Sequence, residues 1–211
     1  VDGVEVKDHV EKACLTGLKA EFELFFTIYC NLVLDHLLSE IESHQRLPED
    51  HKGLLDVIKN KKSFFDDFVR AGFKDARQLF IAQAVPSHGL DRLSDLLTTC
   101  GWRAFDGVTE GCGKDLGEAF EGVVVSPWDQ IQTAFQVRHA IEHAFSHVGP
   151  SFEHKTKTIW RQSSWRRHFG EGGPKRGTRI PLDRVDIEAT AAAMTWVART
   201  LEDTLPKGDA P

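Results

Sequence analysis

The chain has few residues of several kinds, and each scarcity excludes a class of protein. Its 211 residues include one methionine, one tyrosine and four cysteines. The cysteines are far apart and form no CxxC or CxxH pair: Cys14, Cys30, Cys100 and Cys112. This spacing excludes a zinc knuckle and a redox dithiol. A disulfide framework is not needed either, because a chain of this length can bury a core without one.

An uninterrupted apolar run of membrane-spanning length is also missing. The longest apolar stretch, residues 22–38, is interrupted by four polar residues: Glu23, Asn31, Asp35 and His36. We therefore expect no bilayer span. No secretory signal precedes this stretch. The sequence predicts a cytoplasmic protein with no membrane partner.

Alternating polar and apolar residues are almost absent. One short strand is predicted over residues 122–125, within the glycine-rich region. Apolar residues instead recur every three or four positions in several stretches, as in amphipathic helices. These stretches cover residues 6–44, 54–69, 76–85, 90–97, 131–148 and 185–201. The sequence predicts an all-α fold in a single domain, residues 1–211. We expect an antiparallel bundle of about five main helices, with a long basic loop before the last one.

Helix start and stop signals set the expected boundaries. Ser126 and Pro127 begin a helix as N-cap and first residue, and residues 149–150, Gly-Pro, end it. Residues 47–50 break the N-terminal helical region, and residues 181–183 introduce the last helix. Residues 101–125 are rich in glycine and are predicted to form a loop.

The helix that begins at Ser126 carries the densest group of reactive side chains. His139, His143 and His147 recur every four residues and are predicted to form a stripe along one helix face. Arg138 and Glu142 lie among them. Buried imidazoles need partners for both ring nitrogens, so three in consecutive turns favour a functional site over a core.

A zinc site is one interpretation of this stripe. His139-x-x-Glu142-His143 matches the HxxEH pattern of zinc peptidases, in which two histidines bind zinc and the glutamate activates water. Such a site needs a third protein ligand. The last helix offers four acidic residues in no recognised motif: Asp186, Glu188, Glu202 and Asp203. A zinc hydrolase therefore stays an alternative.

A second interpretation pairs Arg138 with His143. Histidine transfers protons near neutral pH, and a guanidinium stabilises charge on a phosphoryl oxygen without a metal. RNA cleavage needs these groups, because RNA supplies its own nucleophile in the 2′-hydroxyl. Residues five apart differ by about 140° around a regular helix. The two side chains therefore meet only through the length of the arginine, a distorted helix or a second subunit.

The segment from Arg138 to His143 resembles the R-x4-H motif of HEPN domains, in which a polar residue usually follows the arginine. The order of elements from residues 126 to 205 is also similar, with the motif on a late helix before a loop and a closing helix. The resemblance implies a metal-independent endoribonuclease acting by 2′-hydroxyl attack without a cofactor. It further implies a homodimer, often a toxin or defence effector with an antitoxin or defence-system partner.

The same resemblance assigns roles to the residues of the motif. His143 is expected to be the general acid/base and Arg138 the group that stabilises the phosphate. His139 occupies the polar position and is expected to orient them. Glu142 and His147 are outside the motif, and we expect supporting roles for them because they are close in the sequence.

A basic segment follows the motif in a chain whose net charge is −6. Between residues 155 and 184 nine lysines and arginines face only Glu171 and Asp183, and Trp160 and Trp165 lie among them. Positive charge beside aromatic rings suits RNA. The predicted RNA contacts are Lys155, Lys157, Arg161, Arg166 and Arg167. A solvated, merely charged loop is the alternative.

A third interpretation of the motif is structural. Arg138 and Glu142 are four residues apart and can form an ordinary helix-surface ion pair. HEPN-like domains without activity also act as interaction modules. A noncatalytic module that binds RNA or protein is therefore the first alternative to a ribonuclease.

Overall fold

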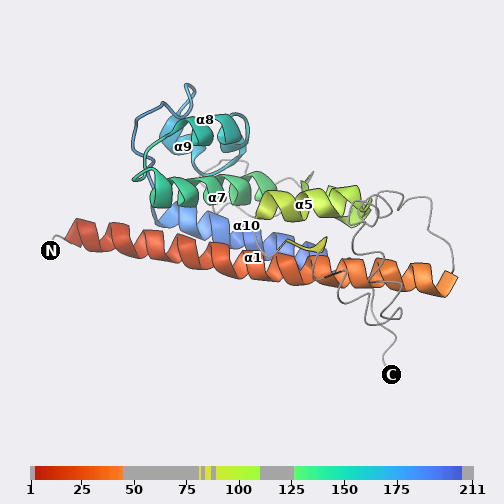
Figure 1. Ribbon diagram of the computed structural model, residues 1–211. Helices are drawn as coiled ribbons and strands as arrows, with labels where there is room; N and C mark the ends of the chain where they lie inside the picture. Colours follow the sequence, from red (N-terminus) through yellow and green to blue (C-terminus); the bar gives the residue numbers. More distant parts are fainter. Residues whose placement is uncertain (1–2, 45–80, 82–83, 87–88, 110–125, 206–211) are drawn as a thin grey trace. The chain divides into compact units, whose positions relative to one another are not determined.

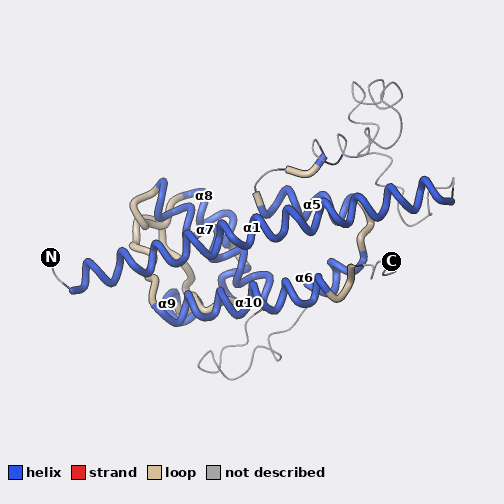
Figure 2. Tube along the Cα trace, turned by 90° about the horizontal axis from the view of Figure 1, so that it is seen from below, coloured by secondary structure: helices blue, strands red, loops and turns tan. Residues whose placement is uncertain are grey.

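The computed structural model describes residues 3–44, 81, 84–86, 89–109 and 126–205. Every regular element in this part of the chain is a helix and none is a strand, which confirms the all-α prediction (Figure 1, Figure 2). The expected strand at 122–125 and the expected helices between 54 and 80 lie outside the described residues. The antiparallel bundle stays a prediction.

The chain divides into two compact units, Val1–Phe22 with Val108–Thr200, and Glu23–Gly107 with Leu201–Pro211. Helix α1 (Gly3–His44) contributes its first half to one unit and its second half to the other. The single-domain organisation stays a prediction.

In the unit that contains Glu23–Gly107, α1 packs with α5 (Leu90–Thr99) and the short 3-10 helix η2 (Arg103–Phe105). Tyr29, the one tyrosine of the sequence, accepts a hydrogen bond of 2.7 Å from Trp102 Nε1 and bonds Thr204 Oγ1 at 2.8 Å. Burial raises the pKa of the Cys30 thiol and raises that of Cys100 to about 12. Both are therefore inert structural thiols.

The unit that contains Val108–Thr200 holds α7 (Pro127–His143), α8 (Pro150–Thr156), α9 (Arg166–Phe169) and most of α10 (Arg184–Glu202). The start of α7 is as expected, because Ser126 Oγ accepts from the Asp129 backbone N–H and Pro127 is the first residue. One face of α7 lies against the first half of α1, where Phe22 and Phe135 pack edge to face. This contact fixes which side of α7 faces solvent.

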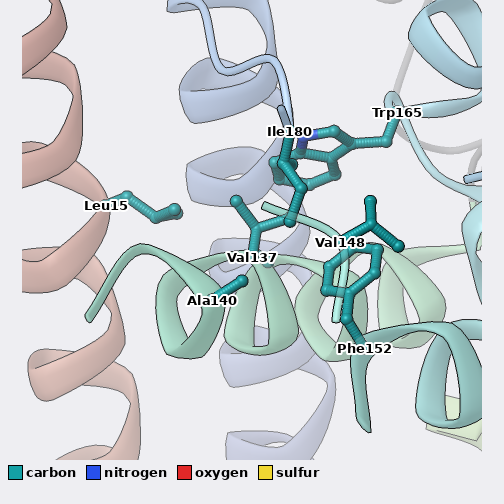
Figure 3. Packing of buried hydrophobic residues seen from close by; sticks show 8 residues of the cluster. Leu15, Val137, Ala140, Val148, Phe152, Trp165 and Ile180 are labelled. Atoms are coloured by element: carbon teal, nitrogen blue, oxygen red, sulfur yellow. The ribbon is translucent and has the colours of Figure 1, made fainter. Parts of the chain in front are cut away.

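A buried cluster beside the last turns of α7 completes that unit (Figure 3). Its members come from α1, α7, α8 and the segments that follow: Leu15, Ala134, Val137, Ala140, Val148, Phe152, Trp165 and Ile180. Burial of a large apolar side chain is worth roughly 1.5–3 kcal/mol. Val137 and Ala140 therefore hold the C-terminal part of α7 in one rotation about its axis.

The structure corrects three predictions: the end of α7, the long basic loop and the glycine-rich loop. Helix α7 ends at His143, six residues before the expected Gly149, and Pro150 begins α8 instead of closing α7. The basic segment is not one long loop, because it contains the 3-10 helix η5 (Ile159–Gln162) and α9. The glycine-rich region also begins with helical turns, η2 and α6 (Asp106–Thr109).

Helix α1 is long and apolar enough, between Glu5 and Glu40, to cross a membrane by length and composition. Its four interrupting polar residues therefore do not exclude a span, contrary to the expectation. Core helices of soluble proteins have the same length and composition, and 44% of the apolar window is buried inside the protein. The cytoplasmic location stays a prediction.

Candidate functional site

The motif residues lie on the last turns of α7, on the side away from the buried cluster. Val137 and Ala140 are buried, whereas Arg138 is partly buried and His139, Glu142 and His143 are exposed. The structure therefore brings four of the five predicted site residues together at the C-terminal end of one helix.

Glu142 connects the two motif side chains. One carboxylate oxygen, Oε1, forms an ion pair with the Arg138 guanidinium, and the other, Oε2, lies 3.7 Å from His143 Nε2. Arg138 and His143 point about 140° apart around the helix, yet both reach this carboxylate from its two sides. The glutamate thus provides a link that the R-x4-H spacing alone lacks.

The Arg138 side chain has donor capacity left. Its Nε is buried, and no group in the described part of the chain accepts a hydrogen bond from it. The guanidinium has five N–H donors, of which the ion pair with Glu142 uses only part. The side chain is 23% exposed, so a phosphate oxygen can reach only its terminal guanidinium N–H groups and not the buried Nε.

His139 and His143 form a second contact within the site. Their ring centroids are 4.6 Å apart, with the planes tilted by 50°. Partial burial lowers the pKa of His139 below its ordinary 6.5, and the nearby His143 and Lys155 lower it further. His139 is therefore a neutral imidazole at pH 7, which can accept a proton. The side chain of His143 is 63% exposed and accessible to a substrate.

His147 is not part of a helical stripe, so the predicted row of three histidines is wrong. The helix stops at His143 because Phe145 and Ser146 adopt left-handed backbone conformations, with φ of 50° and 62°. The His147 ring nitrogen Nδ1 bonds the Phe145 carbonyl oxygen at 2.8 Å, and its backbone pairs with Arg179. His147 belongs to the loop that ends the site.

The zinc alternative still lacks a third ligand. Within the described residues, the one group of three side chains close enough to share a metal is His168, Asp183 and Asp186, and it includes neither motif histidine. Glu142, which would activate the water, is paired with Arg138.

The predicted RNA contacts fall into three sets. Lys155 and Lys157 are exposed at the end of α8. Arg161 and Arg166 line a cleft of about 450 Å³ with Trp160, over whose ring the Arg161 guanidinium lies at 5.6 Å. Trp160 is only 4% exposed, so its ring offers no free face for a base.

Arg167 differs from the other four because its guanidinium is turned inward. It forms ion pairs with Asp183 and, at 3.1 Å, with the buried Asp186. These contacts raise the pKa of Arg167 against the opposing effect of burial, which is the largest influence on it. Its geometry is that of a structural residue.

The Arg161 cleft lies at the opposite end of α7 from the motif. The Ser126 N–H, which precedes α7, donates to the Gln162 carbonyl at 2.9 Å, whereas His143 is the last residue of the helix. At 1.5 Å per residue the two ends are about 25 Å apart. A ligand that contacts both is therefore a polymer of several units.

Sequence reasoning missed a buried polar network in this unit. The side-chain amide of Gln130 on α7 donates from Nε2 to Ser164 Oγ and accepts from the Ser164 N–H at Oε1. Its Nε2 also donates to Thr190 Oγ1 at 3.0 Å. Ser164 Oγ donates to Asp186 Oδ1 at 2.7 Å, and Asp186 Oδ2 lies 2.9 Å from His168 Nε2. The signal in the sequence was Asp183-x-x-Asp186, a reciprocal capping pair at the start of α10.

This network also explains the three potential metal ligands. Both oxygens of Asp186 already accept two hydrogen bonds or ion pairs each, from Ser164, Arg167, His168 and the Asp183 N–H. The guanidinium of Arg167 supplies the positive charge that a metal would bring. The group is therefore complete as a structural anchor.

Comparisons with known proteins identify no relative: no protein-family model, no curated protein and no solved structure matches the chain.

Proposed function

We propose that the protein is a metal-independent endoribonuclease whose site is formed by Arg138, Glu142 and His143 with His139. The observation that carries the proposal is the position of Glu142, one oxygen of which pairs with Arg138 while the other lies 3.7 Å from His143 Nε2. This arrangement places a phosphate-binding cation and a proton-transfer group beside each other on an accessible surface.

The side chains suit cleavage by internal transesterification. Neutral His139 accepts the proton of the 2′-hydroxyl as its oxygen attacks the phosphorus. The bond from phosphorus to the 5′-oxygen breaks, and the leaving oxygen takes a proton from His143. Arg138 stabilises the negative charge that develops on the phosphoryl oxygens. The products are a 2′,3′-cyclic phosphate and a 5′-hydroxyl, and no metal enters the reaction.

Four exposed basic residues give the affinity for the RNA backbone in this proposal: Lys155, Lys157, Arg161 and Arg166. Arg161 and Arg166 line a cleft that includes Gln162, whose carbonyl accepts from the Ser126 N–H at the other end of α7 from His143, so the RNA extends along α7 in this proposal. Binding through these cations weakens as salt rises, because counterions are released from the phosphates. Charge reversal at Arg161 and Arg166 should weaken RNA binding and reduce its salt dependence.

The HEPN resemblance adds a homodimer, a cytoplasmic location and a toxin or defence role with a partner protein to the proposal. Apolar side chains on α1 favour self-association, because Leu24, Ile28 and Leu32 are about half exposed at four-residue spacing. Sedimentation of the purified chain tests the dimer directly.

The test of the proposal is cleavage of mixed single-stranded RNA in excess chelator by wild type, His143→Ala and Arg138→Ala. We expect each substitution to lower the rate at least about 100-fold. His154→Ala removes an exposed histidine of α8 outside the site and should leave the rate unchanged.

Other outcomes favour the alternatives. Activity that disappears with chelator and returns with zinc favours a zinc hydrolase. RNA binding without cleavage by wild type favours the noncatalytic module. Full activity in a folded His143→Ala protein contradicts the proposal.

A further inference from the structure

The residue that follows the site carries the most exposed large apolar side chain among the described residues. Phe145 is 90% exposed, and the next is Leu24 at 58%. Phenylalanine is among the residues most often found buried. Phe145 lies two positions after His143, at the point where α7 ends. A large apolar side chain this exposed, directly after the site, is accessible to a ligand.

The backbone fixes this exposure. Phe145 has a φ of 50°, a conformation that is unusual for a bulky residue and costs free energy. The neighbouring backbone is anchored, because the Ser146 N–H donates to the Ala140 carbonyl at 3.0 Å and the Ile180 N–H donates to the Ser146 carbonyl at 2.7 Å. Ser146 itself is buried. The exposed ring of Phe145 is therefore attached to a backbone that hydrogen bonds hold in place.

The exposed side chains nearest to Phe145 in the sequence are polar, and a lysine lies close to the same histidine pair. His143 and His147 flank it in the sequence and are exposed. Lys155 is near enough to His139 to lower the pKa of that imidazole. Glu142, the nearest acidic side chain in the sequence, is paired with Arg138. Protein interfaces are depleted of charge at their centre, whereas single-stranded nucleic acid binds to aromatic rings set among cations.

We infer that Phe145 is a stacking platform for an unpaired nucleobase next to the cleaved phosphodiester. This inference rests on the proposed ribonuclease function and deepens it, because it names the substrate class as single-stranded RNA. A base in a duplex is already stacked on its neighbours, so its face is not available to Phe145. RNA with a flexible, unpaired nucleotide at the cleavage position is the expected substrate.

The test compares three substitutions that all keep a non-glycine residue at the same backbone position. Phe145→Trp keeps an aromatic face, Phe145→Leu keeps an apolar side chain without one, and Phe145→Ala removes both. We measure kcat/KM on a labelled single-stranded oligoribonucleotide and on the same strand in a full duplex. The Leu and Ala variants should each lose about 10- to 100-fold on the single strand, and Trp should keep the activity. The duplex should be a poor substrate for all four proteins.

A second measurement separates this inference from the proposed function. Binding of the same single strand is measured by fluorescence anisotropy in a His143→Ala background, with and without Phe145→Leu. If wild type does not cleave but Phe145→Leu still weakens binding, the proposed function fails and the stacking platform stands.

Two results overturn the inference. One is equal binding and equal cleavage by the Phe, Leu and Ala proteins. The other is loss of activity in Phe145→Ala that accompanies a change from dimer to monomer in sedimentation, which would make Phe145 a protein contact.

Discussion

Glu142 influences two neighbouring side chains at the end of α7, Arg138 and His139. The carboxylate pairs with Arg138 and raises the pKa of His139, against the stronger lowering effects of burial and of His143. It therefore acts through the groups that touch the substrate, as a positioning residue. Its removal should change both the rate and the pH at which the site works.

We predict that Glu142→Gln lowers kcat/KM roughly tenfold, because a charged hydrogen bond that orients Arg138 is lost. The acidic limb of the pH–rate profile should move to lower pH, since His139 loses a negative neighbour and must be neutral to act as the base. Glu153→Gln on α8 is the matched control, because Glu153 pairs with Arg176 outside the site. A limb that moves to higher pH would contradict this role.

Asp129 should make the stability of the protein depend on pH. Burial raises its pKa to about 6, above the ordinary 3.8. As pH rises from 4 to 6 the unfolded chain loses this proton first, so the free energy of unfolding falls across that range and stays lower above it. Asp129→Asn should therefore raise Tm by a few degrees at pH 7 and leave it unchanged below pH 4. Thermal unfolding followed by circular dichroism at both pH values checks this, and equal Tm shifts at the two would contradict it.

Among the helices, the predicted starts of α7 and α10 agree with the structure, and the predicted end of α7 is wrong. Ser126 and Pro127 begin α7, and Asp183 caps α10, because capping is a local interaction between neighbours in the chain. The end of α7 depends on left-handed conformations at Phe145 and Ser146. Non-glycine residues rarely adopt them, so no sequence pattern predicts this end. The Gly149-Pro150 pair looked like a stop and is instead the start of α8.

Two glycines in the segment before α10 should differ in how much their substitution by alanine lowers stability. Gly173 has a φ of 72°, and a Cβ there would lie 3.0 Å from Cζ2 of Trp160. Gly177 has a φ of 79°, but a Cβ there would meet nothing within 4 Å. Both alanine substitutions pay the conformational cost of roughly 1 kcal/mol, and Gly173→Ala also disturbs a buried indole.

We expect Gly173→Ala to lower the free energy of unfolding by about 1–2 kcal/mol more than Gly177→Ala. Urea denaturation followed by tryptophan fluorescence measures the difference. Equal losses would show that Gly173 does not pack tightly against Trp160.

In the whole molecule, contacts between segments that are distant in the sequence determine the role of some basic residues. Arg138, His139, Glu142 and His143 were predicted as a group because they lie within six residues. Arg167 was predicted to bind RNA, yet it pairs with Asp183 and Asp186, 16 and 19 positions later, which only the folded chain brings close. The position of Gln162 beside Ser126, at the opposite end of α7 from His143, is likewise not readable from the sequence.

The buried network around Asp186 yields a prediction for the stability of the fold. Asp186→Asn removes the charge that balances Arg167 and should lower the free energy of unfolding by about 3 kcal/mol, as breaking a buried ion pair does. Glu188→Gln breaks an exposed pair with Arg184 on the same helix and should leave the free energy of unfolding almost unchanged, because solvent screens such a pair.

Urea midpoints measured for both variants give the comparison. Adding chelator to wild type should not change its midpoint, because Arg167 fills the role of a cation. A stabilised Asp186→Asn protein, or a midpoint that falls with chelator, would show that the acidic residues serve a metal.

In the proposed reaction, Arg138 and the two histidines cleave RNA through its own 2′-hydroxyl without a metal. The most direct measurement is the chemical identity of the product ends after cleavage of a defined single-stranded RNA in excess chelator. The proposed chemistry predicts a 2′,3′-cyclic phosphate on one fragment and a 5′-hydroxyl on the other. A 3′-hydroxyl with a 5′-phosphate would show attack by an external water and would contradict it.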